Sequence, residues 1–472
     1  MRMTITACTA ALALVLPVLT AAPGYAERYG PGSTTGNDPY FPHAGNGGYD
    51  VQHYGLDLSY RPATGRLDGT AVITMTATAD LDAFSLDLRG LTATSVQVDG
   101  KTATFRQLPT DDRGLGGELV VGTRPKLKRS TAHVVTVRYG GAPGRPKDIE
   151  GADYGFVSFP DGAFVANEPE GAATWYPVND QLTDKAAYDF RITVPQGKTA
   201  IANGELVGAP TTAGGLTTFV WRATDPMASY LSTASIGDYT MTTQTGPNGL
   251  PIHNFLETGL SDGNRAVTEA SLGRQPAMID FFDGIFGPYP FTSFGAIVDD
   301  DSVGYALETQ TRPIYGQVAD EGTVAHELAH QWVGNSVTPE LWTDIWLNEG
   351  FASYAEWLWA ESQGRETAQQ QFEQVYEAPA DDPFWSTPPG DPGPETLFDA
   401  ATYDRGAAAL HALRVKIGDP DFFAVLRAWT SENAGGNVST ADLVALSERI
   451  SGEELSAFFT VWIDTPGRPT AW

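Results

Sequence analysis

The stretch Thr323-Val-Ala-His-Glu-Leu-Ala-His-Gln-Trp-Val333 contains an H-E-x-x-H motif, and the organisation of the whole chain can be worked out from it. His326 and His330 are four positions apart, so on a helix both imidazoles project from one face and can bind one metal ion. Glu327 lies about 100° further round the helix axis, where it can reach a water molecule without acting as a ligand. These side chains predict a zinc site with Glu327 as its general base.

A third metal ligand is expected from the segment Trp346-Leu-Asn-Glu-Gly-Phe-Ala-Ser-Tyr354. Eighteen residues separate its Glu349 from His330, and turn formers at 335–339 end the first helix. A second apolar-periodic helix, starting near Trp342, would return Glu349 to the histidines. A His, His, Glu set with one open position is typical of a catalytic zinc ion. The alternatives are a chance match and a structural or inactive metal site.

The block His326-Glu-Leu-Ala-His-Gln-Trp-Val-Gly-Asn335, together with Leu347-Asn-Glu-Gly-Phe-Ala-Ser-Tyr354, resembles the alanyl aminopeptidase (aminopeptidase N-like) family of gluzincin zinc metallopeptidases. The resemblance implies an enzyme with one zinc ion that removes N-terminal amino acids from peptides with a free N-terminus. The eighteen-residue gap fits this family, whereas thermolysin-like endopeptidases usually have one residue more. A thermolysin-like zinc endopeptidase and a catalytically silent peptide-binding protein are the alternative functions.

The N-terminus has the pattern of a secretory signal peptide at residues 1–26: a short basic start, an apolar run over 7–19 and small residues before the cleavage site. Cys8, the only cysteine, lies in this segment, so no disulfide is expected in the mature protein. We expect a secreted, extracellular protein, with a retained N-terminal anchor as the alternative. No later stretch has the roughly 20 uninterrupted apolar residues of a membrane span. The net charge of −29 argues against nucleic acid as a partner.

The chain divides into segments of different composition. Residues 27–48 are rich in turn formers and predict an extended N-terminal arm on the surface. Residues 49–244 alternate apolar and polar side chains in short runs, which predicts an all-β domain of saddle or sandwich form. Residues 245–472 show helical periodicity and predict a mainly α-helical domain, for which the resemblance implies a thermolysin-like fold. The resemblance also implies that this is a short form without the C-terminal helical domain of longer family members.

The segment Val303-Gly-Tyr-Ala-Leu-Glu-Thr-Gln-Thr-Arg-Pro313 stands where the family carries its Gly-x-Met-Glu-Asn motif. The resemblance implies that this edge strand binds the peptide and that Glu308 holds the substrate's α-ammonium group. The sequence departs from the motif, with Tyr305 for the glycine, Leu307 for the methionine and Thr309 for the asparagine. An ordinary edge-strand carboxylate is the alternative interpretation of Glu308.

A second amine-binding carboxylate is implied by the segment Asn167-Glu-Pro-Glu-Gly-Ala-Ala-Thr-Trp-Tyr-Pro-Val-Asn-Asp180. Glu168 matches the family position best, and Glu170 is a near neighbour that could take the role instead. Thr174 and Tyr176 replace the family's usual arginine and phenylalanine. A solvated loop carboxylate is the competing interpretation.

Tyr403, in Thr402-Tyr-Asp-Arg-Gly406, matches a family tyrosine that is followed by a basic residue and glycine. The resemblance implies that Tyr403 stabilises the oxyanion, and we assign no role to Arg405. His53 and His133 fall in strand patterns and are expected to be structural rather than metal ligands.

Overall fold

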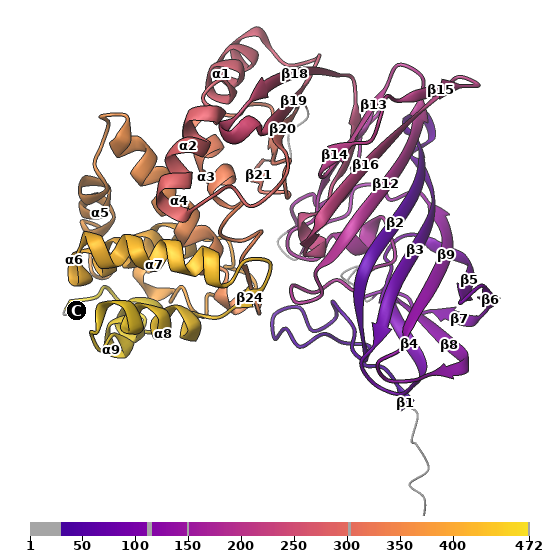
Figure 1. Cartoon of the computed structure of the whole chain (residues 1–472), viewed down its shortest axis with the longest axis horizontal. Coiled ribbons are helices and arrows are strands. Elements are labelled where there is room, and N and C mark those ends of the chain that lie inside the picture. Colours follow the sequence, from indigo (N-terminus) through magenta and orange to yellow (C-terminus); the bar gives the residue numbers. More distant parts are fainter. Residues whose placement is uncertain (1–29, 111–115, 149–150, 301–303, 471–472) are drawn as a thin grey trace, which may run out of the picture.

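The computed structural model describes residues 30–110, 116–148, 151–300 and 304–470. The predicted signal peptide, Cys8 and the first residues of the predicted arm lie outside the described residues. Figure 1 shows a strand-rich domain beside a helix-rich domain, which confirms the predicted fold class. Within the described ranges, no helix has both the length and the apolar character needed to cross a membrane.

The first domain is built around a large sheet whose central strands are β2 (Tyr49–Arg61), β3 (Arg66–Ala77) and β12 (Ala186–Pro195). β2 pairs antiparallel with β3 and parallel with β12. Residues of β2 and β3 alternate between the core and the surface, as the sequence pattern predicted, because successive side chains of a strand point to opposite faces. The other described strands of this domain are β1 (Gly30–Pro31), β4 (Leu81–Asp87), β5 (Thr92–Val98), β6 (Lys101–Thr102), β7 (Thr104–Gln107), β8 (Glu118–Leu127), β9 (Ala132–Gly141), β10 (Gly155–Ser158), β11 (Ala163–Ala166), β13 (Thr199–Ala202), β14 (Glu205–Leu206), β15 (Thr211–Ala213), β16 (Leu216–Met227) and β17 (Ala234–Gly237).

The second domain begins with a mixed sheet in the order β18-β19-β20-β22-β21. Its first strand starts at Tyr239, ahead of the expected domain start at residue 245, because β18 pairs with β19 of the same sheet. The short strand β21 forms the edge next to Glu308. The strands are β18 (Tyr239–Thr245), β19 (Pro251–Glu257), β20 (Phe294–Asp299), β21 (Ala306–Leu307) and β22 (Ile314–Gly316), and a small separate pair joins β23 (Thr338–Pro339) to β24 (Asn437–Val438).

Helices make up most of the rest of the second domain (Figure 1). They enclose a core rich in aromatic side chains. The described helices are α1 (Asp262–Leu272), α2 (Gln275–Phe286), α3 (Glu321–Ala329), α4 (Trp346–Ser362), α5 (Ala368–Tyr376), α6 (Gly406–Ile417), α7 (Asp419–Glu432), α8 (Thr440–Ser451) and α9 (Ser456–Phe459).

The H-E-x-x-H motif lies on α3, and α4 packs against this helix. The Asp320 carboxylate caps α3 by accepting hydrogen bonds from the backbone N–H groups of Gly322 and Thr323, at 3.1 and 3.2 Å. α4 in turn approaches α6 closely, because a Cβ atom on Gly350 would lie only 2.9 Å from the Cα atom of Gly406. Glycine at both positions therefore brings the turn before α6 against the helix that carries Glu349.

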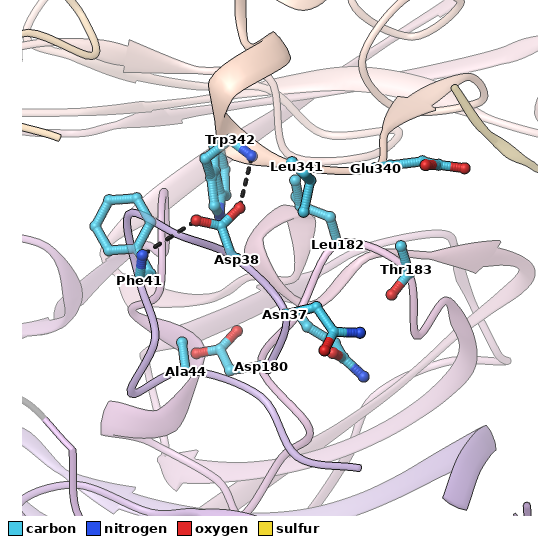
Figure 2. A pocket seen from close by; sticks show the side chains of 11 residues that line it. Asn37, Asp38, Phe41, Ala44, Asp180, Leu182, Thr183, Glu340, Leu341 and Trp342 are labelled. Carbon is cyan, nitrogen blue, oxygen red and sulfur yellow. Dashed lines mark hydrogen bonds between the residues drawn. The ribbon is translucent and has the colours of Figure 1, made fainter. Parts of the chain in front are cut away.

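The described part of the arm, residues 30–48, runs between the two domains and is partly buried, with Phe41 only 6% exposed. Asp38 fixes its position. Figure 2 shows the Asp38 carboxylate accepting hydrogen bonds from the backbone N–H groups of Phe41, at 3.1 Å, and of Trp342 in the second domain, at 2.7 Å. The arm therefore connects the domains instead of lying only on the surface.

Candidate active site

The structure brings together the three predicted metal ligands, which come from two helices. His326 lies on α3, His330 directly follows that helix, and Glu349 lies in the first turn of α4. The Oε2 atom of Glu349 is 3.1 Å from Nε2 of His326 and 3.4 Å from Nε2 of His330. All three side chains are buried. Their ligand atoms therefore converge on one point, as a single metal ion requires.

Hydrogen bonding fixes the ring orientation of His330. Its Nδ1 atom is 3.1 Å from the carbonyl oxygen of Val333, and because a carbonyl can only accept, Nδ1 carries the proton. In the neutral ring, the lone pair of Nε2 then faces the Glu349 carboxylate. Two acceptors face each other only where a proton or a metal ion lies between them, so the donor set fits a zinc ion.

The histidines and Glu349 also influence each other's charge. Burial opposes ionisation of Glu349, but His330 and His326 together lower the pKa of this carboxyl to about 2. The second nitrogen of His326, Nδ1, lies 3.7 Å from Oε2 of Glu356 on the same helix as Glu349. A carboxylate at the outer nitrogen of a ligating histidine orients the ring and raises its basicity.

Glu327 lies in the same cavity without contacting Glu349 as the histidines do. The side chain is buried, and its Oε2 atom has no hydrogen-bond partner among the described residues. Burial raises the pKa of Glu327 to about 8, with the histidines acting in the opposite direction. A carboxyl group with such a pKa can take up a proton and release it again near neutral pH.

The cavity around these residues has a volume of about 240 Å³ and is strongly acidic. Every residue of the predicted site lines it. The lining consists of Glu168, Tyr305, Ala306, Glu308, Thr323, His326, Glu327, His330, Glu349, Glu356 and Tyr403.

Glu168, not Glu170, faces the cavity. Glu170 is turned away and paired with the buried Arg89, whose Nη1 atom lies 3.3 Å from Oε1 of Glu170. Oε1 of Glu168 is buried and has no hydrogen-bond partner in the described structure. Burial and the charge of Glu308 raise the pKa of Glu168 well above its usual range. A cation bound between these two carboxyl groups would satisfy both.

Thr174 and Tyr176, the two residues near Glu168 that depart from the family pattern, form hydrogen bonds inside the β domain. Thr174 accepts a hydrogen bond from the backbone N–H of Phe156 at 2.9 Å. The Tyr176 hydroxyl is 3.1 Å from Oγ of Ser232 and 3.2 Å from the Tyr188 hydroxyl. Neither residue lines the cavity.

The backbone of Glu308 is held by two side chains from the segment that follows the zinc-binding helix α3. Its backbone carbonyl accepts hydrogen bonds from Nδ2 of Asn335, at 2.7 Å, and from Nε2 of Gln331, at 3.2 Å. The Oε1 atom of its carboxyl group is buried without a partner in the described part of the chain. The position of Glu308 is therefore set by its backbone, and a carboxylate oxygen stays available to a ligand.

Tyr305 and Glu356 are lining residues whose place in the cavity was not recognised from the sequence. The Tyr305 hydroxyl donates to the carbonyl oxygen of Asp153 in the β domain at 2.7 Å, so this side chain spans the domain boundary. Glu356 stands two helical turns after Glu349, and that spacing on one helix face could have identified it.

Tyr403 lies in a π-helical turn, Ala401–Arg405, just before α6. The neighbouring Arg405 is fully buried, and its guanidinium donates to backbone carbonyl groups of the surrounding loops, including those of Trp385 and Thr465, at 3.0 and 2.6 Å. Arg405 thus fixes the local backbone rather than entering the cavity.

His53 and His133 lie outside the cavity, as expected for structural residues. Nε2 of His53 is 3.1 Å from the Asp189 carboxylate, and Nδ1 of His133 is 2.9 Å from that of Asp99.

Comparison with known proteins identifies the family. The protein-family model described as "Peptidase M1 N-terminal domain" matches residues 50–231. A second family model, "Peptidase family M1 domain", matches residues 303–462. A crystal structure of an M1 zinc metallopeptidase mutant from Deinococcus radiodurans is 30% identical to this chain, with a TM-score of 0.81. That match covers 92% of this chain and 99% of the other. A two-domain M1 zinc metallopeptidase mutant bound to L-tryptophan matches with 31% identity and a TM-score of 0.82, over 92% of this chain and 99% of that one.

Curated aminopeptidases match the chain over a smaller part of their own length. Aminopeptidase M1-D of Oryza sativa subsp. japonica is 27% identical over 329 residues, which is 64% of this chain. Aminopeptidase N of Streptomyces lividans is 27% identical over 315 residues, or 60% of this chain. The matched regions span 37% and 36% of those two relatives. The chain belongs to peptidase family M1 and takes zinc as its cofactor.

Proposed function

We propose that this chain is a secreted zinc-dependent aminopeptidase that removes N-terminal amino acids from peptides. The observation that carries the proposal is the pairing of Glu168 and Glu308, whose unpartnered buried oxygens face the same cavity as the His, His, Glu set. Such a pair suits an α-ammonium group, which has three donors and a positive charge. A bound N-terminus would hold the first peptide bond near the metal ligands.

Each side chain has a defined task in this proposal. His326, His330 and Glu349 would hold the zinc ion, which supplies Lewis acidity and lowers the pKa of a water molecule towards about 7. Glu327 takes a proton from the attacking water and returns it to the departing amine, a role that suits a buried carboxyl group that lines the cavity beside the metal ligands. Tyr403 donates a hydrogen bond to the carbonyl oxygen as negative charge develops there.

One related structure and two curated relatives support this assignment. A mutant M1 zinc metallopeptidase from Deinococcus radiodurans has been solved with a Tyr-Ser-Ala substrate, and it shares 30% sequence identity with this chain. The curated relatives from Oryza sativa subsp. japonica and Streptomyces lividans carry the name aminopeptidase. A free peptide N-terminus is therefore the substrate group that we propose for this cavity.

The decisive experiment measures release of free amino acids from matched unblocked and N-acetylated peptides, with chelation and zinc add-back. We expect release from unblocked peptides only, because acetylation removes the cation; two charge-assisted hydrogen bonds correspond to a preference of about 100-fold or more. Glu327→Gln should lower kcat by about 10²–10⁴-fold while the protein still binds zinc.

Other outcomes would select the alternative functions. Equal cleavage of blocked and unblocked peptides, at internal bonds, would refute the amine anchor and favour an endopeptidase. Zinc binding and peptide binding without turnover would favour a peptide-binding protein. Glu170→Gln serves as the matched control for Glu168→Gln, because Glu170 is paired with Arg89 and does not line the cavity.

Secretion rests on the apolar run and small residues of the first 26 positions. Expression of the full sequence in a secreting host should yield extracellular protein, and mass spectrometry of its N-terminus should place the first residue near Glu27. Recovery of the uncleaved chain inside the cells would count against this part of the proposal.

A further inference from the structure

Tyr230 belongs to the β domain, yet its hydroxyl group lies against three segments of the helical domain. The residue sits in a single 3-10 turn, Ser229–Leu231, and is 1% exposed. Its hydroxyl donates to the carbonyl oxygen of Gly334 at 3.4 Å and accepts from Nδ2 of Asn348 at 3.3 Å. The hydroxyl also lies beside the carboxyl group of Glu308. Tyr230 does not line the cavity but lies behind it.

Each of these contacts adjoins a residue of the proposed site. Asn348 directly precedes Glu349 on α4. Gly334 lies in the turn that follows α3, and a Cβ atom at this position would be 3.1 Å from Nδ1 of His330. One hydroxyl group thus connects the amine-binding carboxylate with the surroundings of two metal ligands.

The ring of Tyr230 is held in place by aromatic packing. It meets the ring of Trp342 edge to face, with centroids 5.2 Å apart and an interplanar angle of 70°. Trp342 is fixed in turn by Asp38 through its backbone and by the ring of Phe41, whose centroid is 6.0 Å away. Figure 2 shows Trp342, which belongs to the second domain, beside the arm residues Asp38 and Phe41. The hydroxyl therefore reaches the site from a rigid support.

The single proton of the hydroxyl has two acceptors near it, the Gly334 carbonyl and the Glu308 carboxyl group. A hydrogen bond to an ionised carboxylate is shorter and about twice as strong as one between neutral groups. The Glu308 carboxyl therefore competes with the Gly334 carbonyl for this proton, and the Asn348 amide completes the contacts of the hydroxyl oxygen. Oε1 of Glu308 stays without a partner among the described residues and open to a substrate cation.

We propose that Tyr230 is a positioning residue through which the β domain holds the Glu308 carboxylate and the first turn of α4 in their working arrangement. The part of this inference that concerns substrate binding rests on the proposed aminopeptidase function. The part that concerns metal binding rests only on the zinc site. Tyr230 acts through Glu308 and Asn348 and does not touch the reacting atoms.

The test is Tyr230→Phe, which keeps the ring and its packing on Trp342 and removes only the hydroxyl. With saturating zinc, we expect KM for an unblocked peptide to rise about 10-fold and kcat to change by less than about threefold. The preference for unblocked over N-acetylated peptide should fall by about 10-fold, because the carboxylate that binds the ammonium is less well oriented. In competition with a chelator, zinc affinity should fall by about 10-fold.

Tyr49→Phe is the matched control, because Tyr49 is also a buried tyrosine of the β domain and donates to the carbonyl oxygen of Ser85 at 2.6 Å. Its loss should lower thermal stability as much as Tyr230→Phe does, without changing KM, blocked-peptide discrimination or zinc affinity. Unchanged values in Tyr230→Phe, or equal changes in both variants, would overturn the inference. If the wild-type protein releases no amino acid, the proposed function fails; the inference then stands or falls on the zinc affinity alone.

Discussion

The phenol ring of Tyr403 stacks on the imidazole of His326, with ring centroids 5.9 Å apart and an interplanar angle of 23°. Tyr403 comes from the π-helical turn before α6, and His326 comes from α3. The close approach of Gly350 to Gly406 brings that turn towards the metal ligands. The stacked arrangement holds the Tyr403 ring at the edge of the cavity that contains Glu327.

Tyr403→Phe keeps this stacking and removes only the hydroxyl. We expect kcat for an unblocked peptide to fall by about 10²–10³-fold, the usual effect of losing one donor to an oxyanion, with little change in KM. Zinc affinity should stay the same, because Tyr403 is not among the predicted ligands. A wild-type kcat in this variant would remove Tyr403 from the mechanism. Steady-state kinetics with zinc in excess makes the measurement.

Glu356→Ala tests whether the Glu356 carboxylate orients His326, one of the predicted metal ligands. Nδ1 of His326 lies 3.7 Å from the Glu356 carboxylate, and loss of such a partner typically weakens metal binding by about 10–100-fold. We expect that decrease in a chelator competition, with activity recovered at high zinc concentration. Glu377→Ala, at an exposed position after α5, is the control and should bind zinc like the wild type. Equal zinc affinity in both variants would show that Glu356 does not support His326.

Glu118 and Asp87 are a pair of buried carboxyl groups that do not line the cavity, and they make the stability of the fold depend on pH. Burial, together with the neighbouring Asp87, raises the pKa of Glu118 to about 10 from its ordinary value of 4.5. The folded chain therefore keeps a proton that the unfolded chain releases. The stability that this proton contributes is complete below pH 4.5 and is lost as the pH rises towards 10.

Glu118→Gln removes this titration while preserving the shape of the side chain. We expect its melting temperature, relative to that of the wild type, to increase between about pH 5 and about pH 9. Glu205→Gln changes an exposed carboxylate on β14 and should show no such trend. Thermal unfolding at several pH values decides the matter, and parallel curves for the wild type and Glu118→Gln would contradict the prediction.

The features that could be predicted from sequence are those encoded within one short segment. The spacing of His326, His330 and Glu349 is a property of two neighbouring helices, and the structure brings these ligands together. Apolar and polar side chains alternate along residues 49–61, and this local pattern is enough to predict a half-buried strand. Local periodicity does not encode the partner of a strand, so residues 239–244 were expected in the first domain although they belong to β18, which pairs with β19.

The features that were missed depend on contacts between distant segments. Glu168 matched the family position best, but the sequence left Glu170 open as the alternative because it does not reveal that Arg89, about 80 residues away, pairs with Glu170. Arg405 had no predicted role because its acceptors are carbonyl groups of loops far along the chain. Tyr305 was seen only as a departure from a motif, although its hydroxyl bonds to the β domain at Asp153.

Lys185 provides the last prediction, because it connects the β domain to the loop that follows the zinc-binding helix. The ammonium group, just before β12, donates to the carbonyl oxygens of Asn335 and Ser336, each at 3.0 Å, and of Gly436 at 3.3 Å. Asn335 also binds the backbone of Glu308. The partly buried Lys185 side chain thus satisfies three carbonyl groups next to the proposed site.

Lys185→Met keeps the length of the side chain but leaves these carbonyl groups without a donor. Each unsatisfied buried acceptor costs about 1–3 kcal/mol, and partial solvation of the loop should limit the total loss of stability to about 2–4 kcal/mol. The exposed Lys101, on β6, supplies the control: Lys101→Met should change the free energy of unfolding by less than about 0.5 kcal/mol. Denaturant unfolding compares the two variants. If both unfold at the wild-type midpoint, Lys185 does not hold the domains together, and the loop that carries Asn335 must be positioned by the zinc-binding helix alone.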